Sequence, residues 1–364
     1  MGPPARESAQ DDAMRCGGCG AKVPSQALRR VLARLRPVVG GDIALGIGDD
    51  AAVLRFPPDR LLLHTADFFR SFVSDPHLFG RIAANHALGD IYAMGGTPVS
   101  ALAIAAVPHG SEAIVEDDLF QMLSGGKETL DAAGAQLVGG HSAEGGELAL
   151  GFAVTGTVEP GRVLRKAGLR PGDRLVLTKP LGTGILLAGE MRGVAKARWV
   201  EEALAAMQQS AADAASCLVA HGASACTDVT GFGLAGHLLE MLRASAVAAT
   251  LAGDDIPALA GVRETARAGI ASTLAPSNAA EARGAIGGGS GAADPLLFDP
   301  QTAGGLLAGV PPDRVAACVA ALQGLGYARA AVIGVVVALE GGAPLLRIET
   351  SFRAPKTAGW AAGE

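Results

Sequence analysis

Apolar segments that alternate with helical stretches constrain the fold of the first half of this chain most strongly. Candidate strands rich in Val, Ile, Leu and Ala lie at 44–54, 60–66, 99–107 and 147–158. Helical periodicity is found in two longer stretches between them, at about 77–94 and 112–133. Strands that alternate with helices are typical of an α/β domain in which helices cover a mixed sheet.

The second half mixes helices and strands less regularly, as in an α+β domain. Helices are predicted near 184–191, 199–220 and 233–243, and strands near 174–178, 304–309 and 330–338. Glu159-Pro160-Gly161 ends the last strand of the first half, so we place a domain boundary at 160–172. We therefore expect the following divisions: a disordered leader at 1–13, a glycine-rich segment with a helix at 14–40, an N-terminal domain at 41–160, a C-terminal α+β domain at 161–350 and a flexible tail at 351–364.

Composition narrows the class of protein. A chain of 364 residues with 49% hydrophobic and 18% charged side chains can bury two cores. Its net charge of −6 argues against nucleic acid as a partner. The N-terminus lacks the apolar core of a signal peptide, and no apolar run is long enough for a membrane span. Five cysteines do not form a disulfide framework, so we expect a reducing, cytoplasmic location.

A glycine-rich segment, Cys16-Gly-Gly-Cys19-Gly-Ala-Lys22, places a thiol close to an ammonium group. Glycines permit close approach of the backbone to a ligand, and a lysine can lower a thiol pKa or hold a phosphate oxygen. The cysteine pair also resembles half of a zinc site, but no second close pair follows it. The three later cysteines, at positions 217, 226 and 318, are interpreted as small buried apolar residues.

Acidic residues in turns and at the ends of elements predict a magnesium site. Asp49 and Asp50 are adjacent in a glycine-flanked turn, where their charges repel unless a cation is bound. A solvated turn is the alternative interpretation of this pair. Asp67 and Asp228 each follow a predicted strand, and Asp90 lies on the predicted helix four residues after His86; together they favour the cation. Carboxylate oxygens suit Mg²⁺ that bridges phosphate groups.

Histidines and a second glycine-rich motif are less specific. His141 is expected to follow a strand, in a turn that faces phosphate. His86 and His237 are interpreted as helix histidines satisfied by their neighbours. The motif Asp299-Pro-Gln-Thr-Ala-Gly-Gly305 is equally consistent with a packing turn and a ligand loop. Since no Walker loop is present, bound ATP is expected to interact through Mg²⁺ and aspartates.

Taken together, these motifs resemble those of selenophosphate synthetase, or selenide, water dikinase, in the ATP-binding superfamily of aminoimidazole ribonucleotide synthetase. The resemblance covers about residues 16–348. It rests on Cys19-Gly-Ala-Lys22, Gly48-Asp-Asp-Ala-Ala-Val53, Thr65-Ala-Asp-Phe-Phe69, Gly80 to Asp90, Gly139-Gly-His-Ser142, Thr227-Asp-Val-Thr-Gly-Phe-Gly233 and the Asp299 motif. The implied fold has two domains, an N-terminal mixed sheet with helices and a C-terminal α+β domain.

The resemblance also implies an activity and a set of site residues. ATP, selenide and water become selenophosphate, AMP and orthophosphate with Mg²⁺ required, and the product donates selenium for selenocysteine or selenouridine synthesis. Cys19 and Lys22 are the implied catalytic residues, and Asp50, Asp90 and Asp228 the implied metal ligands. The residues implied to lie near ATP are Lys22, Ile47, Gly48, Asp49, Asp67, Asp90, Gly140, His141 and Ser142.

The expected partners, beyond ATP and selenide, are a second copy of the chain in a homodimer and either an upstream oxidoreductase-like fusion domain or a selenium-delivery protein. The leader before Met14 resembles the junction in members fused to an upstream oxidoreductase-like domain. Three alternatives remain: thiamine-monophosphate kinase, a non-catalytic ATP-binding regulator, and a zinc- or selenium-binding thiol carrier. The first lacks the Cys-Gly-x-Lys segment, which is intact here.

Overall fold

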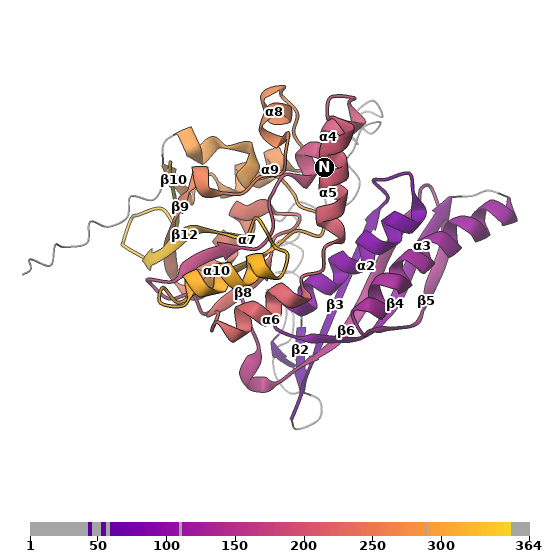
Figure 1. The fold of residues 1–364 in the computed structure, drawn as a ribbon, viewed down its shortest axis with the longest axis horizontal. Helices are drawn as coiled ribbons and strands as arrows, with labels where there is room; N and C mark the ends of the chain where they lie inside the picture. Colours follow the sequence, from indigo (N-terminus) through magenta and orange to yellow (C-terminus); the bar gives the residue numbers. More distant parts are fainter. Residues whose placement is uncertain (1–42, 46–51, 56–58, 109–110, 289, 351–364) are drawn as a thin grey trace, which may run out of the picture.

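Two mixed β-sheets, each covered by helices, make up the part of the chain that the structure describes (Figure 1). The structure is a computed structural model, and it describes residues 43–45, 52–55, 59–108, 111–288 and 290–350. The first sheet lies in the N-terminal half and the second in the C-terminal half. This agrees with the predicted α/β and α+β organisation.

Six strands form the first sheet, in the order β1-β2-β3-β6-β4-β5. In chain order their bounds are β1 Ile43–Leu45, β2 Ala52–Arg55, β3 Leu61–Arg70, β4 Thr97–Pro108, β5 Gln136–Gly145 and β6 Ala149–Val158. Only the β4–β5 pair is parallel among these described strands. Along β3, Leu63 and Phe69 are buried while His64 and Phe68 are exposed, so alternate residues face the helices and the outside.

Helices α2 (Pro76–Ala93) and α3 (Glu112–Ala132) cover the inner face of this sheet (Figure 1). Helix α2 begins at Asp75, whose carboxylate accepts hydrogen bonds from two backbone N–H groups of the first turn. The two helices pack closely because glycines lie at their contact. A Cβ atom at Gly80 would lie 2.0 Å from the carbonyl oxygen of Met122, and one at Gly125 equally close to that of His77.

Seven strands form the second sheet, in the order β10-β13-β9-β12-β7-β11-β8. The strand bounds are β7 Arg174–Leu177, β8 Ala225–Asp228, β9 Val247–Ala252, β10 Ile286–Gly288, β11 Leu306–Val310, β12 Ala331–Ala338 and β13 Leu346–Glu349. The helices are α4 Thr183–Met191, α5 Ala197–Gln208, α6 Ala212–Ala220, α7 Gly233–Ser245, α8 Val262–Arg267, α9 Ala275–Ala282 and α10 Val315–Gly324. Short 3₁₀ turns lie at Pro160–Arg162, Gly253–Asp255, Ser290–Ala293 and Pro295–Leu297.

Helices cover both faces of the second sheet. Val176 and Ala308 face α6 and α10, and they share a hydrophobic cluster with the core of the N-terminal half. Leu175 and Leu307 face the opposite way, toward the cluster that includes α4, α7 and α9. The first cluster therefore joins the two halves of the chain through α2 and α6.

The structure corrects several predicted elements. The strand expected at 44–54 is a pair of antiparallel strands, β1 and β2. The helix expected at 199–220 is interrupted, and its parts are α5 and α6. Three strands and three helices among the described residues were not predicted: β9, β10, β13, α8, α9 and α10. Strand β10 lies in a glycine-rich stretch, and its parallel pairing with β13 supplies hydrogen bonds that composition does not reveal.

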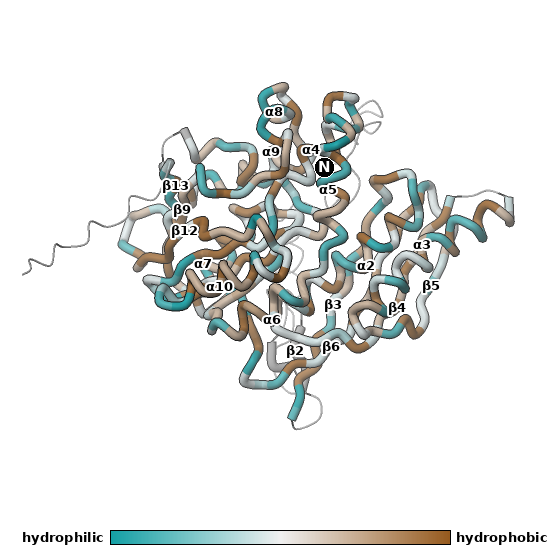
Figure 2. Tube along the Cα trace, viewed as in Figure 1, coloured by the Kyte–Doolittle hydropathy of each residue, from teal (hydrophilic) through white to brown (hydrophobic). Residues whose placement is uncertain are grey.

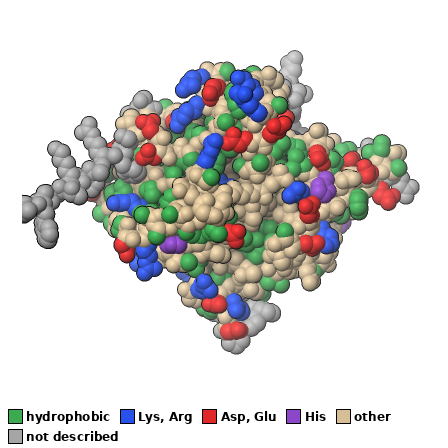
Figure 3. Space-filling view, in the orientation of Figure 1, with side chains coloured by type: hydrophobic (Ala, Val, Ile, Leu, Met, Phe, Trp, Pro, Cys, Tyr) green, Lys and Arg blue, Asp and Glu red, His purple; other side chains and the backbone are tan. Residues whose placement is uncertain are grey.

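Surface and hydropathy patterns agree with a chain that folds around two apolar cores. Apolar and polar residues are interspersed along α2 and α3 (Figure 2). In the described part of the chain, no helix is long and apolar enough to cross a membrane. Basic and acidic side chains are interspersed on the face shown in Figure 3.

Candidate active site

The inner face of β3 and one flank of α2 position two of the predicted site aspartates. Asp67 lies on β3, where its Oδ1 is 3.6 Å from Nε2 of His86 on α2. Thr65, two residues earlier on the same face, donates a hydrogen bond from its hydroxyl to the Asp90 carboxylate. Thr65 and Asp67 share one face of β3, because alternate strand residues point the same way, and His86 and Asp90 are one helical turn apart. Both contacts therefore lie where this face of β3 packs against α2.

His86 also connects this contact between β3 and α2 to the C-terminal half. Its Nδ1 accepts a hydrogen bond of 2.9 Å from the backbone N–H of Ala303. A backbone N–H can only donate, so Nδ1 carries no proton and the ring proton of the neutral tautomer is on Nε2, which faces Asp67. His86 is 1% exposed and contacts Phe69 edge-on. The interpretation of His86 as a helix histidine satisfied by neighbours is confirmed. His237 is likewise buried on a helix, and its Nε2 accepts from Thr230 N.

Asp228 reaches the same part of α2 from the second sheet. It is the last residue of β8, pairs in register with Leu306 of β11 and is 5% exposed. A Cβ atom at Gly89 would lie only 3.2 Å from Oδ2 of Asp228, so this glycine leaves room for the carboxylate against the helix. Two carboxylates from separate strands, Asp67 and Asp228, thus approach residues 86–90 of α2, which include Asp90.

A buried lysine near Asp228 was not among the predicted site residues. Lys179 follows β7, is 2% exposed and donates from Nζ to the backbone carbonyls of Ala206 and Ala303. Burial lowers the pKa of Lys179 to about 7, while the nearby Asp228 carboxylate acts to raise it. The sequence signal that could have identified Lys179 is a lysine close after an apolar strand.

The Asp299–Gly305 motif uses its side chains in internal packing. Gln301 Oε1 accepts from the backbone N–H groups of Gly182 and Thr183, at the start of α4. Its amide nitrogen donates to Asp299 Oδ2 at 2.9 Å. Burial raises the pKa of Asp299 to about 7, against hydrogen bonds from its neighbours that lower it. Of the two interpretations of this motif, the packing turn agrees with these contacts.

Gly140, His141 and Ser142 lie elsewhere on the first sheet. The expected turn after a strand is wrong, because all three residues are within β5, at the exposed edge. Strands β6 and β4 separate β5 from β3, which corresponds to about 14 Å across the sheet. Within one chain, these residues are therefore not beside Asp67.

The remaining predicted residues cannot be placed. Cys19, Lys22, Ile47, Gly48, Asp49 and Asp50 lie outside the described residues. A cavity of about 520 Å³ lies along another flank of α2, where Arg81, Asn85 and Tyr92 line it. None of the predicted site residues that the structure describes lines this cavity.

Comparison with known families defines the class of protein. The model of the AIR synthase related protein, N-terminal domain, matches residues 48–158, and that of the C-terminal domain matches residues 170–345. The structure of AaThiL complexed with AMPPCP and TMP has a TM-score of 0.65 at 19% identity and covers 91% of this chain and 94% of its own. Hydrogenase maturation protein HypE in complex with ATP has a TM-score of 0.63 at 20% identity, with coverage of 89% and 91%. The predicted two-domain fold is confirmed: this is an AIR synthase related protein.

Curated relatives narrow the class further. The selenide, water dikinase of Nitratidesulfovibrio vulgaris is 40% identical over 348 residues, which cover 92% of this chain and 97% of that relative. The Myxococcus xanthus protein of the same name is 41% identical over 331 residues, with coverage of 89% and 93%. The chain belongs to the selenide, water dikinase family, as its motifs predict.

Proposed function

We propose that this protein catalyses the ATP-dependent synthesis of selenophosphate from selenide and water, with release of AMP and orthophosphate. One observation carries the proposal: relatives named selenide, water dikinase match about 90% of the chain at about 40% identity. The approach of Asp67 and Asp228 to the segment of α2 that carries Asp90 supports it, because phosphoryl transfer depends on positioning and charge neutralisation. The product supplies selenium for selenocysteine or selenouridine synthesis.

The donor set fits Mg²⁺. Asp90 and Asp228 offer carboxylate oxygens from facing segments, and their charges favour a bound cation. We assign them as ligands together with Asp50, whose role rests on its motif alone. When bound, Mg²⁺ neutralises charge on the phosphate groups. His86 and Thr65 hold Asp67 and Asp90 toward this region, so the carboxylates are positioned before ATP binds.

The glycine-rich segment Cys16–Lys22 supplies the selenium chemistry in this proposal. Cys19 receives or positions selenium, and Lys22 reduces the repulsion between anionic selenide and anionic phosphate. Selenide is already an anion at neutral pH, so no strong general base is needed.

A homodimer is the proposed assembly. The outer face of the first sheet, opposite α2 and α3, carries five exposed apolar side chains: Phe68, Val99, Leu102, Ile104 and Val138. Strand pairing aligns Phe68, Gly151, Ile104 and His141 in one row across this outer sheet face. A contiguous apolar surface of this kind is typical of a protein interface. A second copy on this face covers the strand that carries Gly140–Ser142.

Anaerobic phosphorus NMR with ATP, Mg²⁺ and selenide tests the reaction. We expect a selenophosphate signal that grows with AMP and orthophosphate, and that is absent in Cys19→Ser and Lys22→Ala variants that still bind ATP. Cys226→Ser, a buried cysteine outside the site, is the matched control and should keep activity. ADP as the sole end product would indicate an ordinary kinase, and ATP binding without turnover a regulator; either result would refute the proposal.

A further inference from the structure

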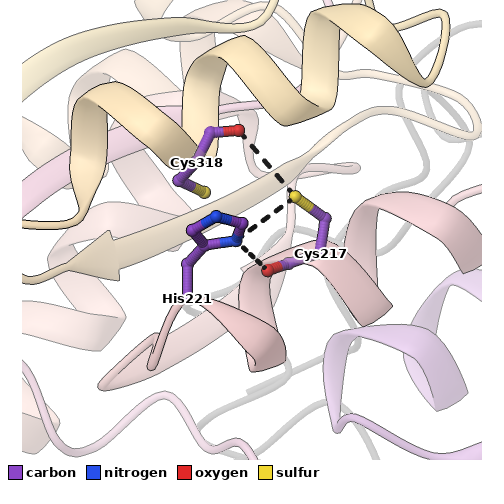
Figure 4. Close-up of side chains that lie close together, drawn as sticks. All are labelled: Cys217, His221 and Cys318. Carbon is purple, nitrogen blue, oxygen red and sulfur yellow. Dashed lines mark hydrogen bonds between the residues drawn. The ribbon is translucent and has the colours of Figure 1, made fainter.

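Two cysteines and a histidine from distant parts of the chain come together outside the candidate active site. Cys217 lies on α6, His221 directly follows that helix, and Cys318 lies on α10 (Figure 4). One ligand atom from each of the three lies within 4.8 Å of the other two. Helices α6 and α10 pack together on one face of the second sheet, which brings together two cysteines 101 residues apart in sequence.

The orientation of His221 leaves one ring nitrogen available. Its Nδ1 lies 2.8 Å from the backbone carbonyl oxygen of Cys217. A carbonyl oxygen only accepts, so Nδ1 carries the proton and Nε2 of the neutral ring has the lone pair. Histidine ligands of metal ions usually donate their other ring N–H to a carbonyl or carboxylate in this way. Figure 4 shows the ring beside both cysteine side chains.

The chemistry of the three groups selects the kind of ion. Two sulfur atoms and one imidazole form a soft donor set, which suits zinc or copper(I) rather than Mg²⁺. Cys318 is 0% exposed and Cys217 is 7% exposed, so a net charge here would be costly. Two thiolates neutralise a divalent ion but leave one negative charge beside a monovalent ion. Charge balance therefore favours Zn²⁺.

We propose that Cys217, His221 and Cys318 form a binding site for Zn²⁺ that links α6 to α10. In tetrahedral zinc sites the ligand atoms lie about 3.4–3.8 Å apart. The widest separation between the three ligand atoms of this cluster must therefore shorten by about 1 Å when the ion binds. Because His221 is only partly buried, water can complete the coordination.

Binding must displace protons from the thiols. Burial raises the pKa of the Cys318 thiol to about 12 and also raises the pKa of Cys217. Both cysteines are therefore thiols at neutral pH when no ion is bound, and each releases one proton as its sulfur becomes a ligand. Without an ion, these buried thiols are expected to be unreactive.

A cobalt(II) titration of the full-length protein tests this site. Co²⁺ substitutes for Zn²⁺ and gives sulfur-to-metal charge-transfer bands, which require cysteine ligands. A background with Cys16→Ser and Cys19→Ser removes the other cysteine pair. We expect one Co²⁺ per chain, displacement by Zn²⁺, and release of about two protons.

Single variants then identify the ligands. Cys217→Ser and Cys318→Ser should weaken Co²⁺ binding at least about 100-fold, and His221→Gln at least about tenfold. Cys226→Ser, also buried and outside the cluster, should bind as the background does. Circular dichroism checks that each variant folds. His221→Gln is the variant least expected to disturb folding, because the His221 side chain is only partly buried.

Three outcomes would overturn the proposal. The folded background protein could bind no Co²⁺ at micromolar concentration. Binding could persist unchanged when the cluster residues are replaced. A third outcome is a Cys217–Cys318 disulfide in the protein purified without reductant, together with no metal uptake after reduction, which would identify the pair as a redox couple.

Discussion

Two replacements of His86 separate the effect of its hydrogen bond with Ala303 from the effect of its contact with Asp67. In His86→Ala, the buried N–H of Ala303 loses its acceptor, and Asp67 loses the ring that faces it. In His86→Asn, the side-chain Oδ1 occupies nearly the position of Nδ1 and can still accept from Ala303. The asparagine is too short to reach Asp67. The two variants therefore differ in one buried hydrogen bond and share the loss of the Asp67 contact.

The structure sets the size of each effect. An unsatisfied buried N–H costs about 1–3 kcal/mol. The edge-on contact with Phe69, at 5.2 Å between ring centroids, adds about 1 kcal/mol in both variants. We expect His86→Ala to lower the free energy of unfolding by about 3 kcal/mol and His86→Asn by about 1 kcal/mol. Because both variants lose the Asp67 contact, both should weaken binding of Mg²⁺-bound ATP analogue about fivefold, equivalent to about 1 kcal/mol.

Urea unfolding followed by circular dichroism and tryptophan fluorescence measures the stabilities, and two probes reveal any separate unfolding of the domains. Calorimetric titration with a nonhydrolysable ATP analogue measures binding. If His86→Asn is as unstable as His86→Ala, the assigned acceptor is wrong. If nucleotide binding is unchanged in both folded variants, His86 does not position Asp67 for ATP.

Four further predictions follow from single contacts. Gly80→Ala should destabilise the protein by about 2–3 kcal/mol in urea unfolding, because its Cβ would lie 2.0 Å from the Met122 carbonyl oxygen; wild-type stability would show that α2 and α3 separate at no cost. Burial raises the folded-state pKa of Asp299 from 3.8 to about 7, so the folded protein binds more protons and stability should fall as pH rises between these values. Asp299→Asn should remove that contribution, and an unchanged pH profile of unfolding would contradict the assignment. Phe68→Lys should convert the proposed dimer to a monomer in analytical ultracentrifugation, because it places a charge on the outer sheet face, and a persistent dimer would exclude this face as the interface. Asp228→Asn should raise the Mg²⁺ concentration for half-maximal activity about tenfold or more, whereas an unchanged Mg²⁺ requirement would remove Asp228 from the ligand set.

Local patterns in the sequence were sufficient for much of the fold. Apolar segments predicted β3 and β4, and helical periodicity predicted α2 and α3 within two residues at each end. These elements are long and strongly patterned, so their own residues specify them. Short elements such as β10 and α8 were missed, because their formation depends on pairing and packing with distant segments.

Motif chemistry also identified residues that the fold later placed together. Asp67 and Asp228 were predicted as acids that follow strands and Asp90 as an acid on a helix. In the structure Asp67 and Asp228 approach the stretch of α2 that carries Asp90. The same reasoning placed His141 in a turn, whereas it lies in an edge strand. A glycine-rich stretch has a turn-like composition, and only its pairing with β4 shows that it is extended.

By itself, the sequence determined the family, the two-domain architecture and which residue types carry chemistry, because these are properties of local pattern and motif. Only the tertiary structure decided which of those residues meet. Cys217 and Cys318 each look like an ordinary buried cysteine, yet α6 and α10 dock on the same sheet face and bring them beside His221. His86 and Ala303 are joined in the same way across 217 residues. Contacts at such separations are set by strand order and helix docking, which depend on the packing of the whole chain and leave no periodic signal in the sequence around either partner.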